Sequence, residues 1–219
     1  MDLSFAVISE NASAHRRLWW KRALDLVVGG ACLVVALPVI GLLALLVKLE
    51  SPGPAFFRQE RVGRFGVPFR IFKLRTMRVG CDDAPHREAA AAWFAGRAVD
   101  DRYKTLADPR ITRVGRVLRR LDLDELPQLF NVMRGEMSLV GPRPAIPYEL
   151  VHYQPQYLER FLVPPGITGL WQVTRRECLS APEMMQLDLR YVKEASPLLD
   201  LKILLKTVPA LVAAALWRS

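Results

Sequence analysis

The sequence predicts a mainly helical α+β protein. It would consist of a re-entrant membrane segment of the helix-break-helix type and a small cytoplasmic domain with a short β-hairpin and interfacial amphipathic helices. Three observations carry this prediction. An uncharged run at residues 26–47 contains Pro38, two strand-like stretches flank a turn at residues 63–66, and apolar residues recur at helical spacing in the second half of the chain.

The uncharged run is long enough for a straight helix to cross the roughly 30 Å hydrocarbon core of a bilayer. It is longer than the apolar core of a signal peptide, and no small-residue cleavage site follows it. We therefore expect it to stay in the mature chain. Pro38 removes a helical hydrogen bond and predicts a break, which leaves two arms that are each too short to span.

Basic residues flank the run on both sides: Arg16, Arg17, Lys21 and Arg22 before it, and Lys48, Arg58, Arg61 and Arg64 after it. Because cytoplasmic flanks of membrane helices are rich in Lys and Arg, this pattern favours a hairpin with both ends in the cytoplasm. A single-pass anchor with a proline kink is the alternative. The chain then divides into a basic interfacial segment (1–22), the re-entrant hairpin (23–50) and a cytoplasmic catalytic domain (51–219).

Composition narrows the kinds of partner. The chain of 219 residues is 51% hydrophobic and carries a net charge of +9, which predicts an anionic partner: nucleic acid, anionic lipid or a phosphorylated substrate. The three cysteines are far apart and lack CxxC spacing. Neither a disulfide framework nor a zinc site is predicted, in keeping with a reducing cytosol.

Two places in the chain carry candidate chemistry. Lys73 shares one side of a predicted strand with Phe69 and Ile71, so its amine either points at a ligand or snorkels at a sheet edge. Asp124 and Glu125 form an acidic pair at the predicted start of a helix, where the dipole favours carboxylates and phosphates. That helix is predicted from residue 124 to 135 by the spacing of Leu126, Leu129, Phe130 and Met133. Helix capping by Asp124 is the ordinary alternative.

The acidic pair is surrounded in the sequence by cations, which favours phosphate chemistry over capping. A carboxylate among cations can act as a metal ligand or as a nucleophile that forms an acyl-phosphate. Hard oxygen ligands predict Mg²⁺, held by Asp124 and Glu125. The cations are Arg110, Arg113, Arg116, Arg119, Arg120, Arg134 and Arg143.

Taken together, these segments resemble the bacterial sugar transferases of the monotopic phosphoglycosyl transferase family over nearly the whole chain. The matching segments are KRALD (21–25), SPGPAFFRQERVG (51–63), FKLRTM (72–77), DPRITRVGR (108–116), LDELPQLFNVMRGEMSLVGPRP (123–144) and PPGITGLWQV (164–173).

The resemblance implies a reaction and a set of partners. Asp124 would attack the β-phosphate of a UDP-sugar, release UMP and pass the sugar-1-phosphate, a hexose-1-phosphate by analogy, to undecaprenyl phosphate. Glu125 would bind metal or assist proton and charge handling. This would be the first membrane step of exopolysaccharide, capsule or O-antigen synthesis, on the cytoplasmic face of the bacterial inner membrane. Membrane lipids are further expected partners, nucleic acid is not, and a homodimer is left open.

The resemblance also implies roles for other residues. Pro38 matches the proline that breaks the re-entrant helix, and phosphate or nucleotide would be held by Lys73, Arg75, Arg119, Arg143 and Arg176. Three departures from the family pattern stand out. Leu37 replaces a serine, Asp122 adds a third carboxylate, and the segment 174–177 differs enough that Arg175 could take the place of Arg176.

Two other functions are weighed against this one. A membrane-tethered nucleic-acid-binding module would use the basic helix predicted at residues 112–120, but it leaves the acidic pair unexplained. A UDP-sugar hydrolase with water as acceptor would have no need of a membrane segment.

At the C-terminus, residues 196–217 are interrupted by charges, which predicts an interfacial or packed helix rather than a span.

Overall fold

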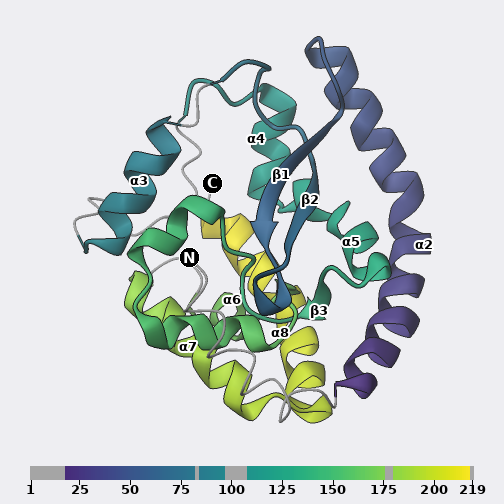
Figure 1. The fold of residues 1–219 in the computed structure, drawn as a ribbon. Helices are drawn as coiled ribbons and strands as arrows, with labels where there is room; N and C mark the ends of the chain where they lie inside the picture. Colours follow the sequence, from purple (N-terminus) through teal and green to yellow (C-terminus); the bar gives the residue numbers. More distant parts are fainter. Residues whose placement is uncertain (1–17, 82–83, 97–107, 176–179, 218–219) are drawn as a thin grey trace.

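The computed structural model describes residues 18–81, 84–96, 108–175 and 180–217, and the fold is mainly helical (Figure 1). A long helix, α2 (Trp19–Glu50), lies along one side of a domain built from short helices and two small sheets. The remaining α-helices are α3 (Ala84–Phe94), α4 (Arg113–Arg120), α5 (Gln128–Arg134), α6 (Leu170–Arg175), α7 (Ala181–Glu194) and α8 (Pro197–Trp217).

The predicted β-hairpin is confirmed. Strands β1 (Phe56–Val62) and β2 (Pro68–Leu74) pair antiparallel, with Phe57 opposite Lys73. The intervening turn, η1 (Arg64–Gly66), holds Phe65 at φ 56°, a left-handed conformation that few non-glycine residues adopt. The hairpin leads the chain from the end of α2 back across the domain.

A second sheet was not predicted from the sequence. Strands β3 (Ser138–Val140) and β4 (Gly166–Thr168) form a short parallel pair. Between them run two 3-10 helices, η3 (Pro147–His152) and η4 (Pro155–Leu162). A Cβ on Gly166 would lie 2.1 Å from the amide nitrogen of Gly141, so the two backbones approach more closely than a side chain allows. Three-residue strands give too little alternation to be read from sequence.

Helix α2 runs without interruption through Pro38, which corrects the predicted helix break. At about 1.5 Å per residue, its 32 residues span roughly 48 Å. The helix stays continuous because both halves pack on the same domain. On the N-terminal side, a Cβ on Gly29 would lie 3.3 Å from Val132 of α5, and on the C-terminal side Ile40 and Val47 are buried. The loss of one hydrogen bond at Pro38 is absorbed within this packing.

Both ends of α2 are attached to the domain by polar contacts. Near its start, the Lys21 amine donates to Asp200 of α8 (2.6 Å), and Asp25 accepts from the Leu139 amide of β3 (2.8 Å). At its end, Glu50 accepts from the Arg113 amide (2.6 Å) at the start of α4. The long helix is therefore fixed to one body along its whole length.

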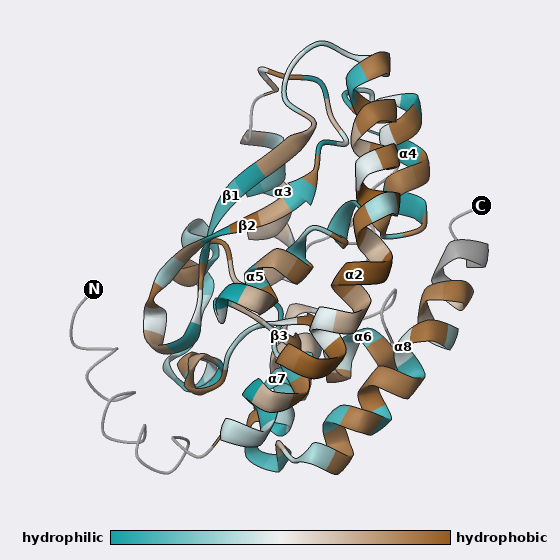
Figure 2. Cartoon of the chain, turned by 90° about the vertical axis from the view of Figure 1, so that its right-hand side faces the viewer, coloured by the Kyte–Doolittle hydropathy of each residue, from teal (hydrophilic) through white to brown (hydrophobic). Residues whose placement is uncertain are grey.

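The outer face of α2 is apolar and exposed. Only 17% of its most hydrophobic 18-residue window is buried, and by length and composition it is the one helix among the described residues that could cross a bilayer. In Figure 2, α2 and α8 are the two long helices that are mostly brown. Large exposed apolar side chains are Val27, Val34, Val35, Leu42, Leu45, Leu46 and Leu49 on α2, and Leu198, Leu201, Leu205, Val208 and Val212 on α8.

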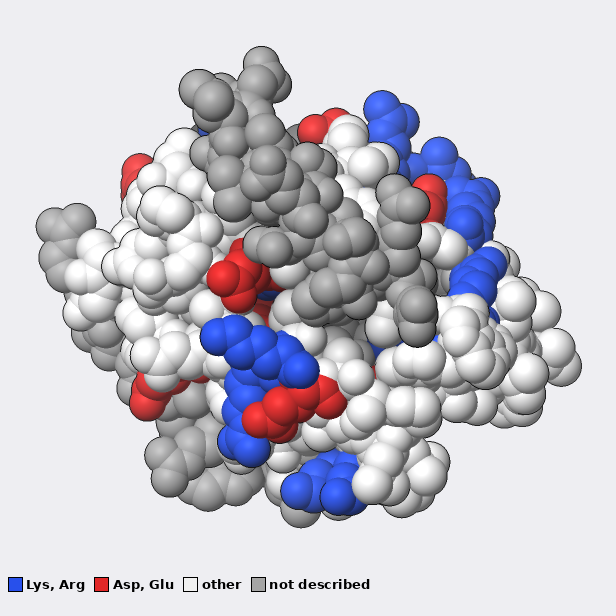
Figure 3. All heavy atoms as spheres, turned by 60° about the horizontal axis from the view of Figure 1, so that its bottom comes forward, with Lys and Arg blue, Asp and Glu red and all other residues white. Residues whose placement is uncertain are grey.

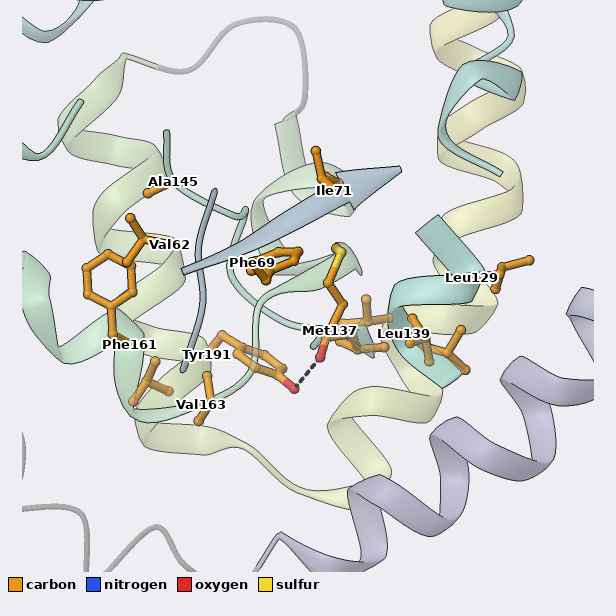
Figure 4. Close-up of a cluster of buried hydrophobic side chains, with 14 of the residues drawn as sticks. Val62, Phe69, Ile71, Leu129, Met137, Leu139, Ala145, Phe161, Val163 and Tyr191 are labelled. Atoms are coloured by element: carbon orange, nitrogen blue, oxygen red, sulfur yellow. Dashed lines mark hydrogen bonds between the residues drawn. The ribbon is translucent and has the colours of Figure 1, made fainter. Parts of the chain in front are cut away.

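The hydrophobic core lies between the hairpin, α5, β3 and α7 (Figure 4). Its side chains come from segments far apart in the sequence, such as Phe69 of β2, Leu139 of β3 and Phe161 of η4. The Tyr191 hydroxyl donates to the Val140 carbonyl (3.3 Å) and to Asp200 (2.7 Å), so a polar connection runs from this core to the Lys21–Asp200 pair. The core thereby holds α2, α7 and α8 together.

Candidate active site

Asp124 and Glu125 lie in a short 3-10 helix, η2 (Leu123–Glu125), that joins α4 to α5. Asp124 is 4% exposed, and Glu125 is half-buried. Asp122, just before η2, has φ 52°, and its amide donates to the Arg119 carbonyl (3.4 Å). A left-handed residue of this kind commonly ends a helix, and Asp tolerates the conformation better than most residues. The turn ends α4 and directs the acidic pair into the interior.

The structure corrects the predicted start of the second helix. Helix α5 begins at Gln128, with Pro127 as its N-cap, and not at Asp124. Pro127 has no N–H to bond to the Leu123 carbonyl, so the chain makes a 3-10 bond there instead, from the Leu126 amide to Leu123 (3.3 Å). Asp124 caps neither helix. The capping alternative is therefore wrong.

Lys73 and Glu125 form an ion pair, with Nζ 3.1 Å from Oε1. Their side chains are 18% and 16% exposed, so water screens the pair only in part. The alternative, a lysine whose amine snorkels to water at a sheet edge, does not fit, because the amine is paired with a carboxylate. The pair places an ammonium group next to the acidic doublet, on the side of the β-hairpin.

Arg119 supplies a second cation from α4. Its Nε donates to the Thr76 hydroxyl (2.9 Å). Burial lowers the pKa of Arg119, while the negative charges of Asp124 and Asp108 raise it. Arginine remains protonated in proteins, so a fixed positive charge acts on Asp124. Lys73 and Arg119 thus lie on the two elements, β2 and α4, that border the acidic pair.

Close packing holds α4 in this position. The Thr76 carbonyl accepts from the Thr112 amide (3.0 Å), and a Cβ on Gly115 would lie 2.1 Å from the same carbonyl oxygen. Thr112 caps α4 by accepting from the Gly115 amide (2.9 Å). Only a glycine at 115 lets the helix approach the strand end this closely. The predicted basic helix at residues 112–120 is confirmed, with its first residue as the cap.

Arg75 has a role that differs from the predicted contact with phosphate. Its guanidinium is buried and donates to backbone carbonyls at the end of α2, those of Ser51 (2.8 Å), Pro52 and Val47 (3.5 Å). The last carbonyls of a helix have no amide partner within the helix, so a cation next to them is favourable. Arg75 therefore ties α2 to the hairpin.

Arg143 belongs to a second polar cluster. Its guanidinium donates to Glu149 (3.0 Å), which is fully buried. The Arg143 carbonyl accepts from Arg160 (2.7 Å), and Arg160 is paired with the buried Asp188. Burial raises the pKa of Asp188, and the charges of Arg160 and Arg143 lower it. This network fixes the backbone of the GPRP segment, while Lys73, Arg119, Asp124 and Glu125 are gathered elsewhere.

Two predicted site residues are not placed. Arg176 lies outside the described residues, and of Arg175 only the backbone is described, as the end of α6.

Charge on the surface is grouped rather than even: on the face drawn in Figure 3, basic side chains cluster, and one cluster is interleaved with acidic side chains. Local pairing, more than the net charge of +9, thus decides where an anion would be attracted.

The acidic pair bordered by Lys73 and Arg119 is thus the candidate site, and comparison with known proteins gives the family. The model of a family described as bacterial sugar transferase matches residues 16–214. The chain belongs to the bacterial sugar transferase family.

Relatives of this sugar transferase carry names of one kind. It is 43% identical over 201 residues to the "UDP-glucose:undecaprenyl-phosphate glucose-1-phosphate transferase" of Caulobacter vibrioides, covering 87% of this chain and 69% of the relative. It is 38% identical over 196 residues to the "Exopolysaccharide production protein ExoY" of Rhizobium meliloti, covering 87% and 84%. It is 40% identical over 201 residues to the "UDP-galactose-lipid carrier transferase" of Erwinia amylovora, covering 92% of this chain but only 42% of the relative.

The donor set of the sugar transferase suits a hard cation. Asp124 and Glu125 offer carboxylate oxygens, and in the part of the chain that the structure describes no cluster of three His, Cys, Asp or Glu side chains could hold a metal by itself. Mg²⁺ is commonly bound by one or two carboxylates together with substrate phosphates and water. Two adjacent carboxylates fit that pattern.

Sequence reasoning missed two residues of this sugar transferase site, Thr76 and Asp108. Thr76 holds Arg119, and Asp108 pairs with Arg110 next to Arg119. Arg110 was counted among the nearby cations but given no role. The signal for Asp108 and Arg110 was present as the DPR triplet, because an Asp two residues before an Arg can accept from its amide and its guanidinium together. Nothing local marks Thr76.

Proposed function

We propose that this bacterial sugar transferase is a phosphoglycosyl transferase. It would move a hexose-1-phosphate from a UDP-sugar to undecaprenyl phosphate through a covalent aspartyl-phosphosugar intermediate and release UMP. The observation that carries the proposal is the buried Asp124 beside Glu125, bordered by Lys73 and Arg119. The names of the relatives from Caulobacter and Erwinia support the classes of donor and acceptor.

In the first step a carboxylate oxygen of Asp124 attacks the β-phosphorus of the UDP-sugar. A bond forms between that oxygen and phosphorus, and the bond from phosphorus to the oxygen bridging the two phosphates breaks. UMP leaves with that oxygen and the electron pair. The sugar-1-phosphoryl group stays on Asp124. No proton has to move, because nucleophile and leaving group are both oxyanions.

In the second step a phosphate oxygen of undecaprenyl phosphate attacks the same phosphorus. The bond between phosphorus and the Asp124 oxygen breaks, and the carboxylate is regenerated. The product is an undecaprenyl diphosphate sugar. Two in-line displacements at one phosphorus let a single carboxylate serve both substrates in turn.

Lys73 and Arg119 would compensate the charge that the phosphoryl oxygens carry in both steps. Fixed cations in a partly dry site are far more effective than the same charges in water. Glu125, held by Lys73, would orient Lys73 and share metal binding with Asp124. Mg²⁺ bound by these two carboxylates would supply further charge compensation on the diphosphate.

The protein would act at the cytoplasmic face of the inner membrane, with α2 in one leaflet. Support comes from the attachment of both ends of α2 to one domain, at Lys21 and at Glu50. A helix held in this way cannot carry its two ends to opposite sides of a bilayer while the domain stays in water. Its exposed apolar face would then be buried among acyl chains, and the basic flanks would remain in the cytoplasm.

The product would feed the assembly of an extracellular polysaccharide, as the name of the Rhizobium relative suggests. The exposed apolar face of α2 argues against a hydrolase, because a reaction with water as the acceptor does not require an apolar helix at the site. The sugar is proposed only as a hexose, since the relatives' names divide between glucose and galactose.

The test is an assay of the purified full chain with Mg²⁺ and undecaprenyl phosphate against a panel of UDP-sugars, with UMP as the measured product. We expect UMP with UDP-glucose or UDP-galactose, and a stoichiometric burst of UMP when the acceptor is left out. Asp124→Asn should abolish both. Asp122→Asn is the matched control, because Asn also tolerates the left-handed conformation at 122. Undiminished turnover in Asp124→Asn would refute the mechanism.

Membrane placement is tested separately by labelling single cysteines. In a chain whose Cys32, Cys81 and Cys178 are replaced, one cysteine is placed before Lys21 or after Lys48. Both positions should react only after the cytoplasmic side is opened. Labelling of just one of them from the periplasm would mean that α2 spans the membrane.

A further inference from the structure

One ion pair in the active-site region has no part in the proposed steps. Asp108 accepts three side-chain hydrogen bonds from Arg110: Nε lies 2.9 Å from Oδ1 and 3.0 Å from Oδ2, and Nη2 lies 2.6 Å from Oδ2. The Arg110 amide also donates to Oδ1 (2.9 Å). A carboxylate that binds both the guanidinium edge and the amide of the same residue fixes the plane of that guanidinium.

Backbone pairing places Arg110 beside the segment that also holds Arg119. The Arg78 amide donates to the Arg110 carbonyl (3.1 Å), and Arg119 Nε donates to the Thr76 hydroxyl (2.9 Å). The charge of Arg110 lowers the pKa of Arg119, whose own charge interacts with Asp124. The hydrogen bonds from Arg110 lower the pKa of Asp108, and the charge of Arg119 lowers it further. Arg110 and Arg119 are therefore both held on residues 76–78, and their charges interact with one another. Such a pair is a natural binding site for a phosphate.

The surroundings of Arg110 indicate which phosphate. The residues directly after it, Ile111 and Thr112, lead into α4, and Glu50 joins the end of the apolar helix α2 to the first amides of α4. Exposed apolar side chains lie on both of these helices: Leu46 and Leu49 on α2, and Val117 and Leu121 on α4. A ligand with a phosphate at one end and a long apolar chain matches this combination.

We propose that Arg110 binds the phosphate of the polyprenyl phosphate acceptor, together with Arg119, and that Asp108 is the positioning residue that holds Arg110. The assignment rests on the proposed function, because it names the acceptor site of that reaction. Asp108 engages Nε and Nη2 and so fixes the plane of a guanidinium that carries five N–H donors. The donor would be bound from the Lys73 side.

Kinetic measurements distinguish a role of Arg110 in acceptor binding from a role in donor binding. Arg110→Gln should leave the UMP burst without acceptor within about twofold, while the KM for undecaprenyl phosphate rises about tenfold to a hundredfold, as expected for loss of a charged hydrogen bond. The KM of Arg110→Lys should lie between those of the wild type and of Arg110→Gln. Added guanidinium ion should partly lower the KM of Arg110→Gln. Arg116→Gln on α4 is the control, since its side chain is exposed. A burst that falls as much as turnover, or an unchanged KM, would overturn the assignment.

A binding measurement makes the test independent of catalysis. A short polyprenyl phosphate and its alcohol are titrated into the full chain in detergent, with tryptophan fluorescence as the signal. Arg110→Gln should weaken binding of the phosphate about tenfold and leave the alcohol unaffected. Asp108→Asn should weaken the phosphate to a lesser degree, because the amide contact is kept while the charge is lost. Equal loss for phosphate and alcohol would mean a structural role. Absence of UMP from any sugar, with this difference intact, would refute only the proposed reaction.

Discussion

The amine of Lys73 lies 3.1 Å from the carboxylate of Glu125, although 52 residues separate them in the chain. This pair connects the β-hairpin to the turn that carries Asp124. Each side chain is mostly buried, so water alone cannot fully hydrate either charge. The hairpin and the acidic turn are thereby fixed to each other at the place where phosphate chemistry is proposed.

The first prediction concerns this pair as a unit. Lys73→Gln and Glu125→Gln should each lower turnover by about a hundredfold or more, because the charge compensation at the site is lost. The double variant should lose little beyond either single variant, as expected for residues that act together. UMP release with saturating substrates measures this. Additive losses would show that the two side chains act separately.

The second prediction concerns Thr76, which positions Arg119. Thr76→Val removes the oxygen that accepts from Arg119 Nε and should lower kcat by about tenfold, at the scale of one hydrogen bond to a charged group. Thr76→Ser keeps the hydroxyl and should restore most of the activity. If the serine variant is as poor as the valine variant, packing and not the hydrogen bond is responsible.

The third prediction concerns the close approach of α4 to the end of β2. Gly115→Ala places a Cβ 2.1 Å from the Thr76 carbonyl oxygen, so backbone must move, and we expect a loss of stability of about 1–3 kcal/mol. Gly41→Ala is the matched control. It lies in α2 with nothing within 4 Å of the new Cβ, and should stabilise by about 0.5–1 kcal/mol. Thermal unfolding in detergent compares them, and equal melting temperatures would contradict the packing argument.

The fourth prediction concerns the buried pair that attaches the start of α2 to α8. Lys21 and Asp200 have side chains 2% and 0% exposed. Asp200→Asn takes the paired negative charge away from a buried ammonium group that also donates to the Tyr191 hydroxyl, and should destabilise the protein by about 3–5 kcal/mol. Replacing the exposed Lys202 on the same helix by Gln should change stability by less than about 0.5 kcal/mol. Urea unfolding followed by circular dichroism distinguishes the two.

The fifth prediction is a dependence of stability on pH. Burial raises the pKa of Asp188 to about 6 even though Arg160 and Arg143 lower it, against 3.8 for the ordinary carboxyl. The folded state then holds this proton more tightly than the unfolded state. The contribution is complete below about pH 3.8 and is lost as the pH rises through about 6. The stability of the wild-type chain relative to Asp188→Asn should therefore fall between pH 4 and pH 6.5, and a constant difference would contradict the raised pKa.

Local patterns in the sequence were sufficient for several elements. Two strand-like stretches on either side of residues 63–66 predicted the hairpin, and the basic segment 112–120 predicted the helix α4 but not its cap. Asp124 and Glu125 were identified by an acidic doublet among cations. These features depend on neighbours within a few residues, which sequence periodicity records directly.

Other features depended on contacts between distant segments. The sequence suggested a break at Pro38, but packing on α5 and on the β2 and α4 ends keeps α2 continuous. Arg75 reads as a phosphate ligand in the motif, yet carbonyls at the end of α2 use its guanidinium. Only the structure shows that Pro127 separates the acidic turn from α5.

The sequence by itself thus determined the acidic pair among cations and the long apolar segment, because charge, apolar length and turn residues are local properties. Only the tertiary structure decided which cations meet the acidic pair and how α2 is held. The contacts of Lys73 with Glu125, of Arg119 with Thr76 and of Lys21 with Asp200 join segments separated by 52, 43 and 179 residues. No local pattern encodes such pairings, because they form only when the core brings the elements together.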